Sequence, residues 1–169
     1  MVKTIKSKYK VIDNFLPQEN FLQIKEELLG KNFSWYYFPD ISFINKTSKN
    51  YLFYMQHVFY SREPNSSYYD FIKTNLLNFI DIKSLIRVKA NFYPNQGIKK
   101  IDEMHIDYKY NHKGAVFSIN TNNGATILKD GTKINSVENR ILFFNPSEEH
   151  DSENCTDQKS RVNININYF

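Results

Sequence analysis

The sequence has little cysteine, glycine or proline. Of its 169 residues only Cys155 is a cysteine, and glycine and proline number five each. A single cysteine excludes an internal disulfide framework and a cysteine-based zinc cluster. The chain also has no internal repeat, no low-complexity block and no linker rich in Gly, Ser or Pro. We therefore expect one domain over residues 1–169.

Long apolar runs are also missing. No run approaches the roughly 20 residues that cross a bilayer. Met1 is followed by a lysine-rich polar stretch, where a signal peptide would have an apolar core. Because the chain has no capacity for internal disulfides, it fits a reducing compartment. These absences predict a cytoplasmic protein with no membrane partner.

What the chain does have is aromatic side chains and positive charge. It contains 14 Phe and 12 Tyr, and 22 Lys and Arg against 18 Asp and Glu give a net charge of +4. Stacking rings and lysines are typical of proteins that bind single-stranded nucleic acid. Phe and Tyr are also common strand residues, and net charge describes association and not fold. We favour the strand interpretation and keep a nucleic-acid partner as the alternative.

Two helices and two strands are predicted in the first half. Phe21, Ile24 and Leu28 recur at helical spacing between Pro17 and Gly30, which are typical first and last markers of a helix. A second apolar stripe predicts a helix over residues 67–80. Residues 35–38 and 51–60 are rich in β-formers and are predicted strands.

From Leu85 onward the apolar period changes to two. Apolar residues alternate with Arg87, Lys89, Asn91 and Tyr93, and the last segment alternates in the same way. The predicted turns between short strands are Asn123-Gly124, Asp130-Gly131 and Asn145-Pro146. This pattern predicts a mainly β fold, an antiparallel sandwich or barrel with the helices outside. Residues 85–169 would form its core and residues 1–84 its support. The polar faces either meet solvent or line a pocket.

The candidate metal ligands begin with His105-Ile106-Asp107. Residues i and i+2 of a strand point to the same face, so an imidazole and a carboxylate can converge on one ion. His150 lies 43 residues after Asp107, behind the apolar strand 141–144 and its turn. Two histidines and one carboxylate form the facial triad of non-haem Fe(II) oxygenases, with coordination positions left open. We therefore predict a catalytic metal site at His105, Asp107 and His150.

A second set of residues is suited to a dicarboxylic co-substrate. Arg161 follows His150 by 11 residues and can bind a carboxylate in bidentate fashion. Asn163 shares its face of the terminal strand, and Tyr93 could donate a second hydrogen bond to the same carboxylate. Asn91 shares the face of Tyr93. We predict that these four residues line the co-substrate pocket.

In this order and spacing, the residues resemble the Fe(II)- and 2-oxoglutarate-dependent oxygenases, especially the prolyl-hydroxylase-like branch and its small viral relatives. The opening residues 11–16 are similar to the start of that branch, and the main resemblance spans residues 85–169. Two positions depart from the family pattern: Asn163, where the family often has Ser or Thr, and Ser118, where it often has Tyr. The segments that carry the resemblance are Ala90–Asn95, His105–Asp107, Ser118–Asn120, Asn139–Phe144 and Arg161–Asn165.

The resemblance implies a double-stranded β-helix, or jelly roll, with the metal inside one mouth. It implies that His105, Asp107 and His150 bind Fe(II), and that Arg161 and Tyr93 hold the C5 carboxylate of 2-oxoglutarate. O₂ would be the second co-substrate and ascorbate a supporting reductant. The implied reaction hydroxylates an unactivated C–H bond and releases succinate and CO₂. A viral chain of this kind would act in the host cytoplasm.

The resemblance favours a prolyl residue in a peptide or protein as the substrate. The same chemistry on a nucleotide, a nucleic acid or a free amino acid stays open, as does a non-catalytic jelly-roll binding module. His57 and His112 do not fit the ligand pattern and are expected to be structural or exposed. Cys155 has no neighbouring base in the sequence and is expected to be inert.

Overall fold

The computed structural model describes residues 9–39, 53–99 and 104–169, and these residues form two antiparallel sheets and two α-helices. The predicted mainly β architecture is confirmed. In chain order the elements are β1 (Lys10–Ile12), α1 (Gln18–Leu29), β2 (Tyr36–Phe38), β3 (Tyr54–Ser61), β4 (Glu63–Pro64), α2 (Tyr69–Asn75), the 3₁₀ turn η1 (Leu77–Phe79), β5 (Leu85–Pro94), β6 (Lys113–Ser118), β7 (Ala125–Leu128), β8 (Lys133–Asn135), β9 (Arg140–Phe144), β10 (His150–Glu153) and β11 (Ser160–Tyr168).

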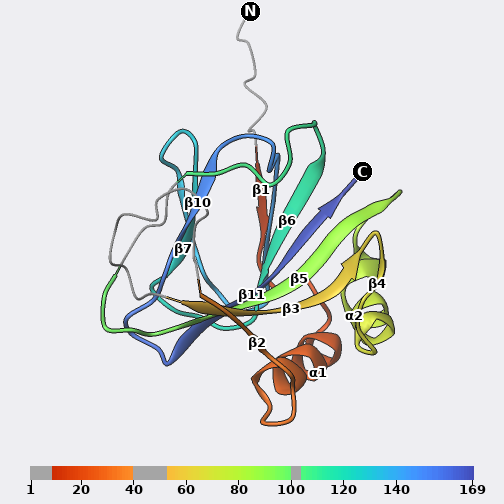
Figure 1. Ribbon diagram of the computed structural model, residues 1–169, viewed down its shortest axis with the longest axis horizontal. Helices are drawn as coiled ribbons and strands as arrows, with labels where there is room; N and C mark the ends of the chain where they lie inside the picture. Colours follow the sequence, from red (N-terminus) through yellow and green to blue (C-terminus); the bar gives the residue numbers. More distant parts are fainter. Residues whose placement is uncertain (1–8, 40–52, 100–103) are drawn as a thin grey trace, which may run out of the picture.

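The two sheets differ in size. The large sheet has the strand order β1-β9-β6-β11-β5-β3-β2, with β4 paired to β3, and the small sheet has the order β10-β7-β8. Figure 1 shows α1 and α2 on one side of the large sheet and the strands β7 and β10 on the other. The large sheet therefore has one face toward the helices and one toward the small sheet.

The predicted helices are confirmed in one case and modified in the other. Helix α1 starts directly after Pro17 and ends at Gly30, as predicted. The predicted helix over residues 67–80 is divided into α2 and η1 at Leu76, whose φ of −133° is not helical. The side chain of Asn75 donates to the carbonyl of Phe71, and such local hydrogen bonds compete with the regular helix ladder. Leu76 itself is fully buried, so core packing also holds the chain in this conformation.

The predicted strands and turns also have counterparts. Strand β3 covers most of predicted strand 51–60, of which residues 51 and 52 lie outside the described residues. Asp130-Gly131 joins β7 to β8, where Gly131 adopts a φ of +83° that favours glycine. Asn145-Pro146 lies between β9 and β10, and Asn123-Gly124 directly precedes β7.

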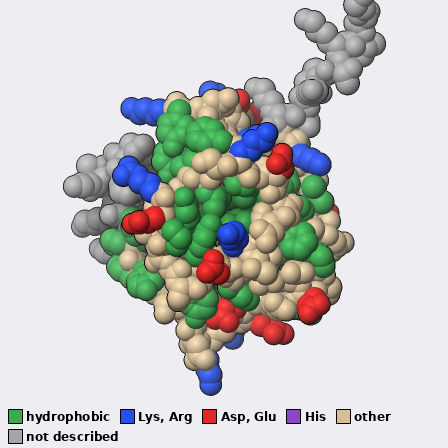
Figure 2. All heavy atoms as spheres, turned by 90° about the vertical axis from the view of Figure 1, so that its right-hand side faces the viewer, with side chains coloured by type: hydrophobic (Ala, Val, Ile, Leu, Met, Phe, Trp, Pro, Cys, Tyr) green, Lys and Arg blue, Asp and Glu red, His purple; other side chains and the backbone are tan. Residues whose placement is uncertain are grey.

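The main hydrophobic core lies between the helices and the large sheet. Alternate residues of β5 and β11, including Val88, Ala90 and Ile164, are fully buried there against Ile24 and Leu28 of α1. Figure 2 looks at the molecule from the side that is on the right in Figure 1, where apolar side chains gather centrally among scattered charged groups. The apolar side chains buried between the helices and the large sheet stabilise the fold.

The other face of β5 and β11 is polar and lies inside the molecule. The antiparallel register pairs Tyr93 with Arg161 and Asn91 with Asn163, and these four side chains line one cavity. The sequence left open whether the polar faces meet solvent or line a pocket, and the structure decides between the two. The polar face lines a pocket between the sheets, and only farther along, at Leu142 and Phe144 of β9, does the inner face become apolar. Within the described ranges, no helix is long and apolar enough to cross a membrane.

Candidate metal centre

The two predicted histidine ligands are held side by side by backbone hydrogen bonds. His105 and His150 form an isolated antiparallel bridge in which each backbone N–H donates to the other residue's carbonyl at 2.9 Å. Their ring centroids lie 4.6 Å apart. This bridge continues the small sheet beyond β10, so residues 45 positions apart in the chain meet at one edge of that sheet.

Asp107 is brought to the same point by a separate backbone contact. Its N–H donates to the carbonyl of Pro146 at 2.9 Å, in the turn between β9 and β10. That turn packs against Gly114, where an added Cβ would lie 2.5 Å from Cγ of Pro146. One ligand atom each of His105, Asp107 and His150 lies within 4.8 Å of the others, and these residues span exposed, half-buried and buried positions. The predicted triad is therefore assembled as a compact group.

Hydrogen bonds orient these ligands. Nδ1 of His150 contacts the carbonyl of Glu148 at 3.0 Å, which makes Nδ1 the protonated nitrogen and leaves Nε2 as the acceptor for a metal. The two oxygens of Asp107 accept hydrogen bonds from Arg87 at 2.8 Å and from Asn167 at 3.0 Å. Such contacts to the groups that bind a metal fix their orientation.

The electrostatic environment favours the protonation states that metal ligands need. Burial lowers the pKa of His150, with a further contribution from His105, so its imidazole is neutral at neutral pH. Burial opposes the ionisation of Asp107, but the guanidinium of Arg87, with smaller electrostatic contributions from His150, Lys89 and His105, holds its pKa below the usual value. A neutral imidazole and a carboxylate are the ligating forms of these side chains.

Arg161 lies in the wall of the same cavity and is almost completely buried, with 1% of its surface exposed. Its guanidinium donates to the hydroxyls of Ser136 at 2.8 Å, Ser152 at 2.6 Å and Thr126 at 3.1 Å. Gly124 makes room for it, because a Cβ there would lie 2.7 Å from Cδ of Arg161. These hydroxyl groups hold the guanidinium in the cavity wall, and a guanidinium is suited to bind a carboxylate.

The other predicted co-substrate residues are gathered around Arg161. The ring of Tyr93 lies under its guanidinium, with 5.6 Å from Cζ to the ring centroid. Nδ2 of Asn91 donates to Oδ1 of Asn163 at 3.0 Å. Within the described residues, the buried amide oxygens of Asn91 and Asn165 lack a hydrogen-bond partner. Buried polar atoms are normally satisfied, so these two indicate a polar occupant.

The cavity and the donor set together fit a metal and a small polar co-substrate. Its volume is about 80 Å³, several times the ~10–15 Å³ that one water needs by this measure. The three ligands offer two imidazoles and one carboxylate and no sulfur, a set that suits Fe(II) with open positions.

Arg87 and Lys89 share the face of Tyr93, so the sequence predicted that they line the pocket or lie on a solvated face of the sheet. Both lie on the polar face of β5, and Lys89 lines the metal cavity while Arg87 binds Asp107. Burial lowers the pKa of Lys89 to about 8, reinforced by Arg87 and opposed by Asp107. The alternation of β5 gave their face, but it did not give the contact between Arg87 and Asp107, two residues that are 20 positions apart in the chain.

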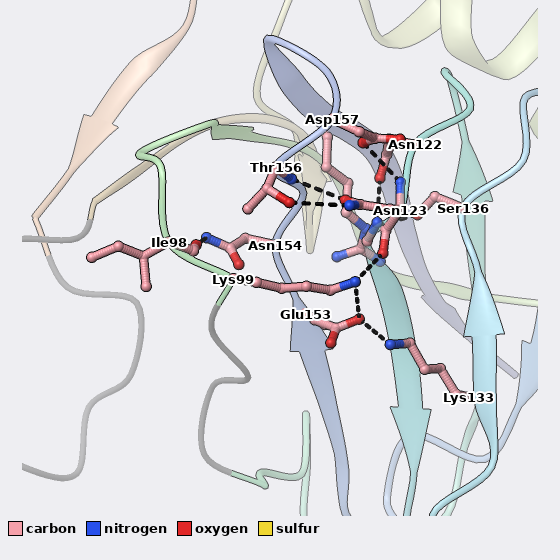
Figure 3. Close-up of polar contacts among 12 residues, drawn as sticks. Ile98, Lys99, Asn122, Asn123, Lys133, Ser136, Glu153, Asn154, Thr156 and Asp157 are labelled. Atoms are coloured by element: carbon pink, nitrogen blue, oxygen red, sulfur yellow. Dashed lines mark hydrogen bonds and ion pairs between the residues drawn. The ribbon is translucent and has the colours of Figure 1, made fainter.

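A polar cluster at the far end of the small sheet contacts residues 98–99. Figure 3 shows Lys99, which donates to the carbonyl of Asn123 at 3.0 Å and lies 3.7 Å from a carboxylate oxygen of Glu153. Glu153 also forms an ion pair with Lys133, and Asn154 donates to the carbonyl of Ile98 at 2.7 Å. The cluster ties residues 98–99 to β8 and β10.

The remaining residues weighed from the sequence lie outside the ligand group. His57 contacts the carbonyl of Ser34 and the hydroxyl of Ser66, both at 2.7 Å, and is 4% exposed. Nδ1 of His112 contacts the carbonyl of Tyr110 at 2.9 Å. Cys155 is buried, and burial raises the pKa of its thiol. These positions agree with the expected structural roles.

Comparison with solved structures identifies the fold. No protein-family model matches the sequence, and no curated protein is similar to it. A prolyl hydroxylase from Trichoplax adhaerens, in complex with a hypoxia-inducible-factor peptide fragment, superposes with a TM-score of 0.69 at 14% identity, over 97% of this chain and 84% of that one. The viral collagen prolyl hydroxylase of Paramecium bursaria Chlorella virus 1, in a complex with 2-oxoglutarate, gives 0.58 at 15% identity, over 95% and 94%.

The chain has the prolyl-hydroxylase fold. The predicted jelly-roll core is confirmed by this likeness. The prolyl-hydroxylase fold also accommodates other chemistry, since a non-haem α-ketoglutarate-dependent epimerase of nogalamycin biosynthesis superposes with a TM-score of 0.66 at 10% identity, over 96% of this chain and 77% of that one. The reaction and its substrate must therefore be argued from this chain's own residues.

Proposed function

We propose that this protein is an Fe(II)- and 2-oxoglutarate-dependent dioxygenase that hydroxylates a prolyl residue in a peptide or protein. The observation that carries the proposal is the convergence of His105, Asp107 and His150 within 4.8 Å of one another. The buried Arg161 in the same cavity supports a dicarboxylic co-substrate. The peptide bound to the Trichoplax prolyl hydroxylase supports a peptide as the substrate class.

In this proposal each residue has a defined task. His105, Asp107 and His150 hold Fe(II) on one side and leave the other coordination positions open. Arg161 binds the distal carboxylate of 2-oxoglutarate, with Tyr93 beside it, while Asn91 and Asn163 line the same cavity. When bound, Fe(II), 2-oxoglutarate and O₂ supply the oxidising chemistry that hydroxylates a C–H bond and yields succinate and CO₂. Ascorbate serves as the supporting reductant.

Hydrogen bonds keep Asp107 as a carboxylate in one orientation. Arg87 and Asn167 donate to its two oxygens, and the position of its backbone is set by Pro146. The polar wall of the cavity orients the co-substrate. The chain thus contributes positioning of the metal and of the co-substrate.

Two measurements test this function. Purified protein should bind Mn(II) as an Fe(II) substitute, and Asp107→Ala should weaken that binding by about 100-fold or more, because it removes a ligand. With Fe(II) and ascorbate the protein should convert 2-oxoglutarate to succinate, and a screen of proline peptides, nucleotides and free amino acids should show hydroxylation of a peptide. His112→Gln is the matched control, because His112 lies outside the ligand group.

Different outcomes separate the proposal from its alternatives. Unchanged Mn(II) affinity in both His105→Ala and Asp107→Ala would overturn the metal site. Absence of any metal binding would instead indicate a binding module that has kept the prolyl-hydroxylase fold. Arg161→Lys should raise the 2-oxoglutarate concentration for half-maximal turnover by about 10-fold or more, since it removes the bidentate geometry.

A further inference from the structure

A second, larger cavity meets the metal cavity at two side chains. It has a volume of about 770 Å³ and is walled by β2, β3, β5 and residues 65–68. Tyr54 and Lys89 line both this cavity and the smaller one that contains His105, His150 and Arg161. A molecule in the larger cavity therefore reaches the metal-binding side chains past Tyr54 and Lys89.

The junction of the two cavities is positively charged. Arg87 and Lys89 are neighbours on the inner face of β5, and Arg87 is engaged by Asp107 through its salt bridge at 2.8 Å. No carboxylate of the described residues lies within salt-bridge distance of Lys89. Among the described residues, its ammonium lies 5.8 Å from the ring centroid of Tyr54.

Keeping Lys89 in this position costs free energy. It is half-buried beside a second cation, and burial together with Arg87 lowers its pKa to about 8. A carboxylate within reach would stabilise a partly desolvated ammonium beyond what the aromatic contact provides. Within the described residues, Asp107 is engaged by Arg87 and Asn167, and Lys89 faces the larger cavity, where it can bind a carboxylate of a molecule held there.

Binding of 2-oxoglutarate does not explain the positive charge of Lys89 in the cavity wall. In the proposed function, Arg161 binds the distal carboxylate of 2-oxoglutarate, and the opposite end of 2-oxoglutarate binds the metal. The two cations also lie over different rings, Arg161 over Tyr93 and Lys89 over Tyr54, and these rings stack at a centroid distance of 5.4 Å. Lys89 thus forms a second cationic subsite, on the side of the larger cavity.

The larger cavity is suited to a peptide with few apolar side chains. Aromatic rings and hydroxyl or amide groups share its wall, which allows stacking and hydrogen bonds to a backbone. The residues that supply them are Ser34, Tyr36, Phe38, Gln56, Ser61, Asn65, Ser66, Ser67 and Tyr68.

We propose that Lys89, with Arg87 beside it, binds a carboxylate of the peptide substrate, so that this site selects acidic peptides. The inference rests on the proposed function and adds its substrate class. The carboxylate has two sources, an Asp or Glu side chain near the hydroxylated residue or the free C-terminus of the peptide.

Binding of matched peptides tests the inference. The probes are acetyl-Ala-Glu-Pro-Ala-amide and acetyl-Ala-Pro-Glu-Ala-amide, each against its Gln counterpart, and acetyl-Ala-Ala-Pro as free acid against its amide. Calorimetric titration is performed without O₂, on protein loaded with Mn(II) and 2-oxoglutarate and on metal-free protein. A charge-assisted contact should favour at least one acidic member by about 10-fold or more. The preferred pair identifies the source of the carboxylate.

Variants assign the preference to Lys89. Lys89→Met should abolish it and Lys89→Arg should retain most of it, whereas Lys31→Met, at an exposed lysine after α1, should leave it unchanged. Equal binding within every pair would overturn the inference. Weaker binding of 2-oxoglutarate by Lys89→Met, with the peptide preference intact, would also overturn it and make Lys89 a co-substrate ligand. Failure of the proposed function is seen separately, as a lack of Mn(II) binding and succinate formation.

Discussion

The two faces of the large sheet are built from the same strands and have opposite characters. Toward the helices, β5 and β11 present Val88, Ala90 and Ile164, all fully buried. Toward the small sheet, the residues between them are polar, and Arg161 and Asn163 are buried nearly as completely. Burial therefore does not distinguish stability from function in this fold. What distinguishes them is whether the buried face is packed by its own side chains or lines a cavity.

The comparison predicts unequal effects of two adjacent residues of β11. Ile164→Ala should lower the free energy of unfolding by about 2–5 kcal/mol, because it leaves a cavity in the core. Asn165→Ala should cost less than about 1 kcal/mol, since among the described residues its amide oxygen has no hydrogen-bond partner to lose. Urea denaturation of both variants measures the difference, and equal costs would contradict the distinction between the faces.

The inner face also depends on close backbone packing behind Arg161. An added Cβ at Gly124 would lie 2.7 Å from the carbonyl oxygen of Glu153 as well as from Arg161. Gly124→Ala should therefore cost about 1–3 kcal/mol of unfolding free energy. If Arg161 binds the co-substrate, the variant should also need about 10-fold more 2-oxoglutarate.

Gly131→Ala is the control for this effect. Its φ of +83° strains an alanine, but an added Cβ meets nothing within 4 Å. It should lose stability without a change in the 2-oxoglutarate requirement. An equal rise in that requirement for both variants would show that general destabilisation, and not displacement of Arg161, is responsible.

The helix face of the large sheet also carries a titratable side chain, His57. Its centroid lies 4.6 Å from that of Phe33, and burial lowers its pKa below the usual 6.5, opposed by the carbonyl of Ser34. The unfolded chain binds the proton more readily, so this stability is present above about pH 6.5 and is lost as the pH falls. The loss is at most about 1.4 kcal/mol per pH unit for one proton.

Substitution isolates this contribution. The unfolding free energy of the wild type, measured in urea at pH 7.5, 6.5 and 5.5, should fall more steeply than that of His57→Gln. Parallel pH profiles would mean that protonation of His57 does not couple to folding.

The smallest effects are expected at the ion pairs of Glu153, at the rim of the small sheet. Lys99 and Lys133 are both more than a third exposed, so Lys99→Met or Lys133→Met alone should cost less than about 1 kcal/mol. The double variant should cost more than the sum, because the carboxylate of Glu153 is only 6% exposed and loses both cations. A double-mutant cycle in urea measures this coupling, and strict additivity would contradict it.

Much of this protein could be predicted from local sequence. The alternation in residues 85–93 and 161–167 determined the strands and their two faces, because side chains of a strand point alternately to opposite sides. Pro17 and Gly30, at the two ends of the helical apolar pattern, were sufficient to predict the bounds of α1. The end of α2 at Leu76 was not predictable, since it follows from an internal hydrogen bond and from burial in the core.

The candidate site was likewise predictable only in part. The order and spacing of His105, Asp107, His150 and Arg161, with the family resemblance, were enough to nominate them. The sequence alone did not reveal that Arg87 holds Asp107, that Lys89 stands between two cavities, or that Gly124 makes room for Arg161. Those are contacts between segments distant in the chain.

By itself, then, the sequence determined which residues alternate and which chemical groups the chain carries. Only the tertiary structure decided that the polar face of β5 and β11 turns inward, because the small sheet covers it and the helices cover the other face. Periodicity gives each strand two faces, but the packing of the neighbouring layers decides which face becomes the core and which becomes the site.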